Sequence, residues 1–426
     1  MSYTLTYEFP EEKIAGNVTI LLSIIFTISG SGSDTTVEAE DYGLNIVDIG
    51  ELTWEFNMDE YLIVPGRLNL QIFDRSNILG AHLFEDDDYI DPTTVKLEIK
   101  RGTGSYATEF TGIIYNESIE RNHYDKTLSF EIMPETEILQ RTRIYDFDNT
   151  TPLAPLGYYT GTKNLKTLIE DCYKLINPSV VLTWTHDWLL YGLKKSDNTV
   201  KADEQAIDIL DIDLDMFFNN PAVGFTTIKD VLIACAREFY SFTGMIDHNR
   251  AFFRKLDNKA LAEIQDVPNV DIISRRKFMK FNPIKYAYTQ MVGASDIGAE
   301  LPSHSPFTKL EGDYLKIDFL LNWSMIANTT IGNAEFEYLS DDYILTKIKD
   351  LDLLGADYVE NQTAILQLWY NRRSNKLLNT AIELVIKGTE YSILKTIEFD
   401  GVLYQPILLK KNFLENKSTF ELLRIE

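Results

Sequence analysis

Between residues 62 and 132 the chain is built from short runs in which apolar and polar residues alternate, and this pattern most constrains its fold. Gly, Pro, Asn and Asp residues separate the runs, as at Pro65-Gly66. The apolar members of the three clearest runs are Leu68, Leu70 and Ile72; Val95, Leu97 and Ile99; and Leu128, Phe130 and Ile132. Because a period of two places every second side chain on the same side of a strand, these runs predict an antiparallel sheet with one buried face.

Three segments follow from the same reading. Residues 1–146 are predicted to form a β domain with one short helix near residues 78–84. Residues 147–290 are predicted to form a linker and a small α+β middle domain, because residues 147–162 are rich in Pro, Gly and Thr. Residues 291–426 return to a β pattern. The predicted fold class is therefore mainly β with an α+β insertion.

Two amphipathic helices mark the middle segment. Their apolar faces repeat at helical spacing: Leu165, Leu168, Ile169, Cys172, Leu175 and Ile176 in the first, and Ile228, Val231, Leu232, Cys235 and Phe239 in the second. Thr226 or Thr227 is the expected N-cap of the second helix. A hairpin is expected to follow, between residues 244 and 254.

The C-terminal segment has its own hairpin signal, Asp400-Gly401, between apolar residues. Strands are expected at residues 382–386 and 391–397, and a helix near residues 363–370. Residues 126–132 also resemble residues 417–423, and each would be the last strand of its β region. Two interpretations stay open: chance, which readily gives seven loosely similar residues, or an internal duplication.

The charge of the chain limits its partners. It carries 40 Lys and Arg against 65 Asp and Glu, a net charge of -25, with a pI near 4.6. Such a surface repels nucleic acid and gains nothing from neutralising phosphates. Two interpretations stay open: solubility alone, or an acidic wall along a path that DNA passes without sticking. The run Glu85, Asp86, Asp87 and Asp88 is the candidate for such a wall, against the plainer interpretation of a solvated loop.

Cys172 and Cys235 are the only cysteines, and both fall on apolar helix faces. We expect buried thiols, no disulfide framework and no cysteine-based zinc site, which fits folding in a reducing cytoplasm. The apolar run at residues 18–28 has 11 residues. It is too short to span a bilayer and follows an acidic leader, so we expect a buried strand and no membrane-spanning segment.

No motif predicts catalysis, a metal site or a cofactor. The five histidines are not paired at metal-ligand spacing, and the aspartates from Asp208 to Asp215 do not match a calcium loop. Trp184 and Trp188 are candidates for a sugar-stacking surface, although burial is the more common role of such residues. A glycosidase carboxylate pair stays open, but 65 acidic residues make that signal uninformative. We therefore expect a protein that is not an enzyme.

Three features together resemble the hub proteins of phage tail tips and baseplates. They are the early β region from Leu62 to Asp74 with its closing strand at Leu128, the helix 230–239 with the hairpin after it, and the β region from Ile382 to Ile425. The resemblance spans nearly the whole chain and is one of pattern. It implies two tail-tube-like β-barrel domains on either side of the middle domain, with no catalytic residues in this module.

The resemblance also implies partners and a place. A homotrimer would present six tube-like barrels and so adapt a sixfold tail tube to a threefold tip, with an acidic lumen for DNA in transit. Expected neighbours are a tail tube or distal tail ring protein, a tape measure protein, and spike or fibre proteins. The chain would assemble in the host cytoplasm and reside in the virion.

Three other functions stay open. The chain would instead be a distal tail or adaptor ring protein, a carbohydrate- or receptor-binding tail protein, or, ranked last, a glycan hydrolase. A stable hexamer favours the ring protein. Saturable glycan binding favours the binding protein, and hydrolysis of cell-wall material that is lost on single carboxylate substitutions favours the hydrolase.

Overall fold

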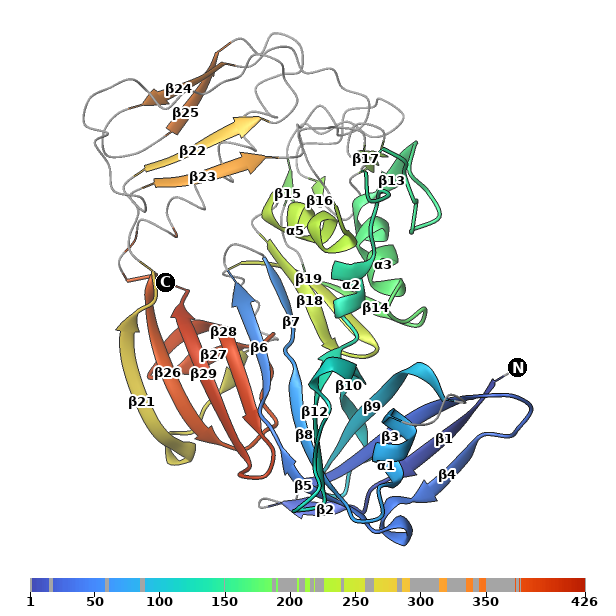
Figure 1. Cartoon of the computed structure of the whole chain (residues 1–426). Helices are drawn as coiled ribbons and strands as arrows, with labels where there is room; N and C mark the ends of the chain where they lie inside the picture. Colours follow the sequence, from blue (N-terminus) through green and yellow to red (C-terminus); the bar gives the residue numbers. More distant parts are fainter. Residues whose placement is uncertain are drawn as a thin grey trace.

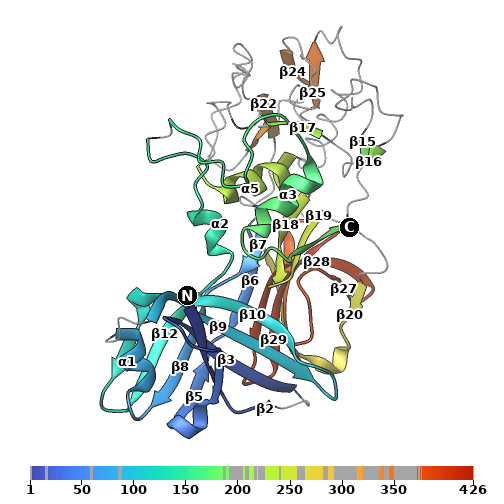
Figure 2. The same ribbon diagram turned by 90° about the vertical axis from the view of Figure 1, so that its right-hand side faces the viewer.

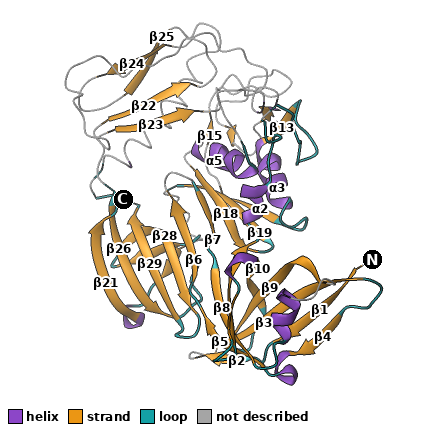
Figure 3. Cartoon of the chain, in the orientation of Figure 1, coloured by secondary structure: helices purple, strands orange, loops and turns teal. Residues whose placement is uncertain are grey.

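A computed structural model describes the chain over residues 2–14, 18–57, 61–84, 89–148, 150–185, 189–190, 205–206, 211–214, 218, 226–238, 241–256, 264–281, 286–291, 314–319, 335–339, 345–349, 372, 375 and 377–425. Strands dominate this part, with a few helices beside them (Figure 3). The mainly β fold class predicted from the alternating runs is confirmed. The helix expected near residues 363–370 lies outside the described residues.

The first sheet has ten strands, and its main path runs β4-β1-β3-β9-β10-β12-β8-β5. In that order the strands are β4 (Thr35–Glu38), β1 (Ser2–Glu8), β3 (Val18–Ser29), β9 (Tyr89–Arg101), β10 (Ala107–Ile114), β12 (Thr127–Pro134), β8 (Leu68–Asp74) and β5 (Leu44–Ile49). Two short strands, β11 (Glu120–Asn122) and β2 (Glu12–Ile14), pair with β12 and β3. The strand predicted at residues 18–28 is β3, and its residues pair on both edges.

One face of this sheet is the core that the alternation predicted. Leu68, Leu70 and Ile72 are buried, and their neighbours Asn69 and Gln71 are not. Helix α1 (Ile78–Phe84) lies where a short helix was predicted. The sheet is strongly bent (Figure 1). Its buried apolar side chains belong to one packed cluster.

The second sheet has eleven strands, and its main path runs β14-β19-β18-β7-β6-β28-β29-β26-β21. These are β14 (Val181–Thr185), β19 (Arg250–Lys255), β18 (Ser241–Asp247), β7 (Leu62–Pro65), β6 (Leu52–Asn57), β28 (Val402–Asn412), β29 (Lys417–Arg424), β26 (Thr380–Lys387) and β21 (Ile272–Met279). Strand β27 (Thr396–Phe399) pairs with β28, and β20 (Ile264–Asp266) pairs with β27. This sheet takes strands from all three predicted segments (Figure 2), and the domain boundaries stay a prediction.

Helices α2 (Glu137–Arg141), α3 (Leu165–Lys174) and α5 (Ile228–Glu238) belong to the predicted middle segment or its border. The two predicted amphipathic faces are confirmed over the described residues, and Phe239 lies outside them. Cys172 and Cys235 are buried free thiols on these faces. At the start of α5 the backbone N–H of Thr227 donates to Asp230 Oδ2 at 2.8 Å, and the backbone N–H of Asp230 donates to Thr227 Oγ1 at 3.4 Å. This reciprocal cap is why the helix begins there.

The remaining elements are short. The 3-10 helices are η1 (Ala39–Tyr42), η2 (Asn116–Ser118) and η5 (Asn269–Asp271). Four strand pairs stand apart from the two large sheets: β13 (Thr162–Asn164) with β17 (Asp211–Asp213), β15 (Leu189–Leu190) with β16 (Gln205–Ala206), β22 (Tyr286–Met291) with β23 (Tyr314–Phe319), and β24 (Glu335–Leu339) with β25 (Leu345–Lys349).

Two hairpin predictions are confirmed and one strand prediction is wrong. Strands β18 and β19 form the expected antiparallel pair. The Asp400-Gly401 turn joins β27 to β28, and both residues have positive φ, 50° and 71°, as a tight hairpin requires. Residues 391–395, however, lie outside any strand, with a turn at Ile393 and Leu394, and the strand begins only at Thr396. Because β21 and β29 already occupy both edges of β26, no edge is free for the next segment to pair beside it.

The two sheets contain a repeated unit. In the first, neighbouring strands follow the order β9-β10-β12-β8-β5, and in the second the order β27-β28-β29-β26-β21, with antiparallel pairing throughout. In each unit a loop of four residues leads into the last strand, and the two residues that flank the loop are paired across neighbouring strands. These closing pairs are Asn122 with Thr127 and Asn412 with Lys417. The last loop residue has positive φ in both, 57° at Lys126 and 50° at Asn416.

This register refines the echo seen in the sequence. When the closing pairs are superposed, Phe130 corresponds to Phe420 and Glu131 to Glu421, one residue away from the sequence match. Both phenylalanines are buried. The four-residue loops determine which residues of the two last strands are equivalent. The sequence comparison matched the strand residues without these loops, so it was offset by one residue.

Candidate functional site

The predicted acidic wall lies outside the described residues, because Glu85, Asp86, Asp87 and Asp88 all fall in the gap between 84 and 89. Of the aspartates tested against a calcium loop, Asp211 and Asp213 lie in β17, whereas Asp208 and Asp215 are outside the described residues. Over the described ranges, no group of three or more His, Cys, Asp or Glu side chains is placed to hold a metal ion.

The histidines have separate roles. The buried Tyr7 of β1 has its Oη 3.0 Å from His82 Nε2 of α1. His123 is exposed, and His186 and His304 are outside the described residues. His248 Nδ1 lies 2.5 Å from Glu135 Oε2, so it ties the β18–β19 turn to the residue that follows β12. The structure therefore does not bring the described histidines into one site.

Trp184 is half-buried in β14, and its ring stacks on Phe253 with centroids 4.6 Å apart and an angle of 9° between the planes. One face of the indole is therefore occupied by a side chain of the neighbouring strand. Trp188 lies outside the described residues.

A buried charge cluster joins the two repeated units, and the sequence analysis did not identify it. Glu109 on β10 contacts Lys411 Nζ on β28 through Oε1, and its Oε2 lies 3.4 Å from Arg101 Nη2 at the end of β9. Arg101 Nη2 also donates to the carbonyl oxygen of Thr389 at 2.8 Å. The side chains of Lys411 and Glu109 are only 7% and 14% exposed. The Lys411 ammonium group also lies 5.0 Å from the centroid of the Trp54 ring.

The electrostatics of this cluster favour the ionised carboxylate. Burial alone raises the pKa of Glu109, but the nearby charges of Lys411 and Arg101 outweigh it and hold that pKa below its ordinary value of 4.5. A buried charge needs such partners, since an unpaired carboxylate in an apolar interior is very costly. The cluster therefore joins strands of the two units through buried charges that offset one another.

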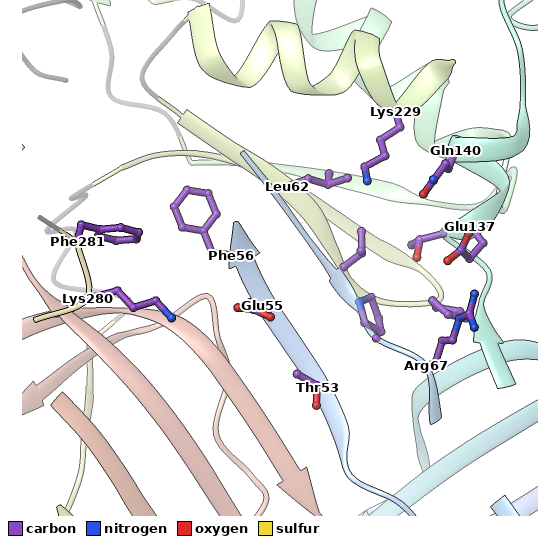
Figure 4. A pocket seen from close by; sticks show the side chains of 15 residues that line it. Thr53, Glu55, Phe56, Leu62, Arg67, Glu137, Gln140, Lys229, Lys280 and Phe281 are labelled. Atoms are coloured by element: carbon purple, nitrogen blue, oxygen red, sulfur yellow. The ribbon is translucent and has the colours of Figure 1, made fainter. Parts of the chain in front are cut away.

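A groove of about 550 Å³ is lined mainly by residues of β6, β7, α2 and α5 (Figure 4). Its described lining includes no histidine, cysteine or serine; the lining residues are Thr53, Glu55, Phe56, Leu62, Val64, Pro65, Gly66, Arg67, Pro134, Thr136, Glu137, Gln140, Lys229, Lys280 and Phe281. Arg67 pairs with Glu131 at 2.8 Å, and Lys280 pairs with Glu421 at 2.5 Å.

These two carboxylates occupy equivalent positions of the repeated unit. Each unit thus turns a glutamate of its closing strand toward a cation on the rim of the groove. The rim of the groove thus carries one cation paired with each of the two units.

In the part of the chain that the structure describes, no helix has the length and apolar character needed to cross a membrane. No family model matches the chain, and a search of curated proteins finds no match.

Solved structures give distant similarities. The chain is similar to the 43 kDa tail protein of prophage MuSo2 from Shewanella oneidensis, with 12% identity and a TM-score of 0.42 over 90% of this chain and 97% of that one. It is similar to a tail protein from Neisseria meningitidis MC58, with 9% identity and a TM-score of 0.41 over 89% and 95%. A Francisella PdpA-VgrG complex in a half-lidded form follows, with 9% identity and a TM-score of 0.36 over 88% and 54%. At TM-scores below 0.5, these similarities assign the chain to no family.

Proposed function

We propose that this chain is a structural protein of a phage-type tail tip, a hub in which three copies close the tail tube and adapt its sixfold symmetry to a threefold tip. The observation that carries the proposal is the repeated five-strand unit, with order β9-β10-β12-β8-β5 in one sheet and β27-β28-β29-β26-β21 in the other. Three chains with two related units each would present six units around one axis, which is what contact with a sixfold tube requires.

The buried cluster supports a rigid relation between the two units. Lys411, Glu109 and Arg101 connect β28 to β10 and β9. A ring of six units works as an adaptor only if the two units of a chain keep a fixed angle. Charged partners in a buried junction specify one arrangement, because any other leaves a charge unpaired.

The charge balance supports a lumen that DNA passes without being held. The chain carries a net charge of -25, and residues 1–146 alone contain 27 Asp and Glu against 10 Lys and Arg. A wall of this sign repels phosphates. We place Glu85, Asp86, Asp87 and Asp88 on that wall as part of the proposal.

The proposal names partners and assigns no reaction. The partners are two further copies of the chain, a tail tube or distal ring protein, a tape measure protein and spike or fibre proteins, within a virion assembled in the host cytoplasm. The chain would act by assembly and not as an enzyme.

The test is the solution mass of the full chain by light scattering across a concentration series. The hub predicts a mass near three times 48.9 kDa, or growth toward it as concentration rises. A stable hexamer would replace the hub with a distal ring protein. A strict monomer at the highest concentrations, with no growth on addition of tube protein, would overturn the assembly role. A sugar-binding role would then be tested by glycan titration.

A further inference from the structure

Charge is distributed unevenly between the two β regions. Residues 1–146 carry 27 acidic and 10 basic residues, whereas residues 264–281 and 377–425 together carry 8 acidic and 10 basic ones. The second region is therefore slightly positive in a chain whose net charge is -25. Two units with the same fold do not need different net charges in order to fold. The difference in net charge therefore indicates that the two regions contact different surfaces.

The positive charge is concentrated on one edge strand. Strand β21 ends the second sheet and pairs with β26 alone among the described strands. Arg275, Arg276 and Lys277 are consecutive in it, and all three are exposed. Arg275 pairs with Asp400 at 3.1 Å, whereas Arg276 and Lys277 form no ion pair within the described residues. This edge therefore presents cations to solvent that nothing described neutralises.

The opposite edge of the molecule is acidic. Strand β4 ends the first sheet and pairs with β1 alone among the described strands. Glu38, at the end of β4, and Glu40 and Asp41, in the 3-10 helix after it, are all exposed. These three carboxylates form no ion pair in the part of the chain that the structure describes.

The two edge strands lie on opposite sides of the molecule, β21 at the left and β4 at the lower right of Figure 1. A contact between them must therefore join two copies, and it is heterologous, with the basic edge of one copy against the acidic edge of the next. Heterologous contacts close into rings when the rotation per subunit allows it. Opposite potentials also steer such subunits together and reject like-charged pairings.

A plainer role for the basic edge is protection against edge-to-edge aggregation, for which lysines and arginines on an edge strand are well suited. That role is served by charge of either sign. On a chain with 65 acidic and 40 basic residues, three consecutive cations on this edge favour a charged partner.

We propose that the basic edge of β21 docks on the acidic edge around β4 of a second copy of the chain. This inference rests on the proposed ring and names the surface that builds it. Its occupant is a second copy because that copy offers exposed, unpaired carboxylates at an edge that the first copy's β21 cannot reach.

Charge reversal tests the docking on the full chain. The variant R276E/K277E makes both edges acidic, and E38K/E40K makes both basic. Each is expected to weaken self-association by about tenfold or more at low salt, measured by light scattering and sedimentation velocity. The combined variant with all four substitutions restores opposite charges and is expected to associate like the natural chain. K387E/K395E changes two exposed lysines of the same region that lie outside β21, at the end of β26 and in the segment before β27. It makes the same change in charge as R276E/K277E, so it is the matched control and is expected to leave association unchanged.

The outcomes separate this inference from the hub itself. If the natural chain forms trimers and the edge variants form them equally well, this docking is wrong and the hub stands. If both edge variants lose association and the combined variant does not recover it, charge complementarity between these edges is also refuted. If the natural chain is monomeric at every salt concentration, alone and with tube protein, the hub proposal and this docking both fail.

Discussion

The substitution Lys411→Met tests the buried cluster between the two units most sharply. Lys411 is 7% exposed and its partner Glu109 is 14% exposed, so the change leaves a buried carboxylate without its closest cation. Removing one partner of a buried ion pair costs about 3–5 kcal/mol. Arg101 stays 3.4 Å from Glu109 and is one third exposed, so it compensates in part. We therefore expect a loss near the lower limit, about 3 kcal/mol.

Urea unfolding measures this loss through the midpoint and the slope, under solution conditions where all variants have the same oligomeric state. The double variant K411M/E109L removes both charges and is expected to lose less than about 1 kcal/mol, because no unpaired charge remains. Lys417→Met is the control, since its pair with Glu415 is largely exposed and contributes at most about 1 kcal/mol. The reasoning is refuted if Lys411→Met is as mild as this control, or if the double variant is the less stable of the two.

The same pair gives a pH dependence of known sign. Because the folded pKa of Glu109 is lowered from 4.5, its stabilisation is full above the unfolded value and is lost as pH falls through the folded one. The stability difference between the natural chain and K411M/E109L should therefore shift against the natural chain as the solution becomes more acidic than pH 4.5. A difference that stays constant over that range contradicts the assignment.

Three further predictions concern the middle segment. Gly244→Ala is expected to destabilise by about 1–3 kcal/mol in urea unfolding, because a Cβ there overlaps the carbonyl oxygen of Ile63 on the adjacent strand; a neutral change would show that the two strands separate freely. The hydrogen bond that His248 donates to the Glu135 carboxylate raises the pKa of His248 above 6.5, so its stabilisation is full below pH 6.5 and lost as pH rises through the folded value. His248→Gln should then lower the melting temperature at pH 6 more than at pH 9, and an equal loss at both would rule out the charged pair. Asp230→Ala removes the cap of α5 and should cost about 1 kcal/mol, seen as faster amide exchange in its first turn; unchanged exchange would mean that the cap is dispensable.

Local chemistry made much of this fold predictable. The Asp400-Gly401 turn, the cap at Thr227 and the alternation around Leu70 each involve neighbours in sequence, and each is found where expected. Residues 391–395 were assigned to a strand wrongly, because their local pattern carries no information on which sheet edges are already occupied.

The pairing of strands that are far apart in the sequence could not be predicted. Strands β6 and β7 lie between β5 and β8 in the chain but pair in the second sheet, next to β28 and β18. Nothing in their residues identifies that partner. In the same way, Glu109 and Lys411 are 302 residues apart, and each alone is one charge in a strand. Lys411 alternates with the buried Leu409 and Phe413, so a charge at a core-facing position would have marked it. Glu109 is out of step with the buried Phe110 and carries no such signal.

End-on images of the assembled protein test the central claim most directly. Class averages from electron microscopy of the purified full chain should show a ring with six similar lobes, related by threefold symmetry in two alternating kinds, because each chain contributes two versions of one five-strand unit. A ring with three lobes, or particles that stay single chains in the presence of tube protein, would contradict the account.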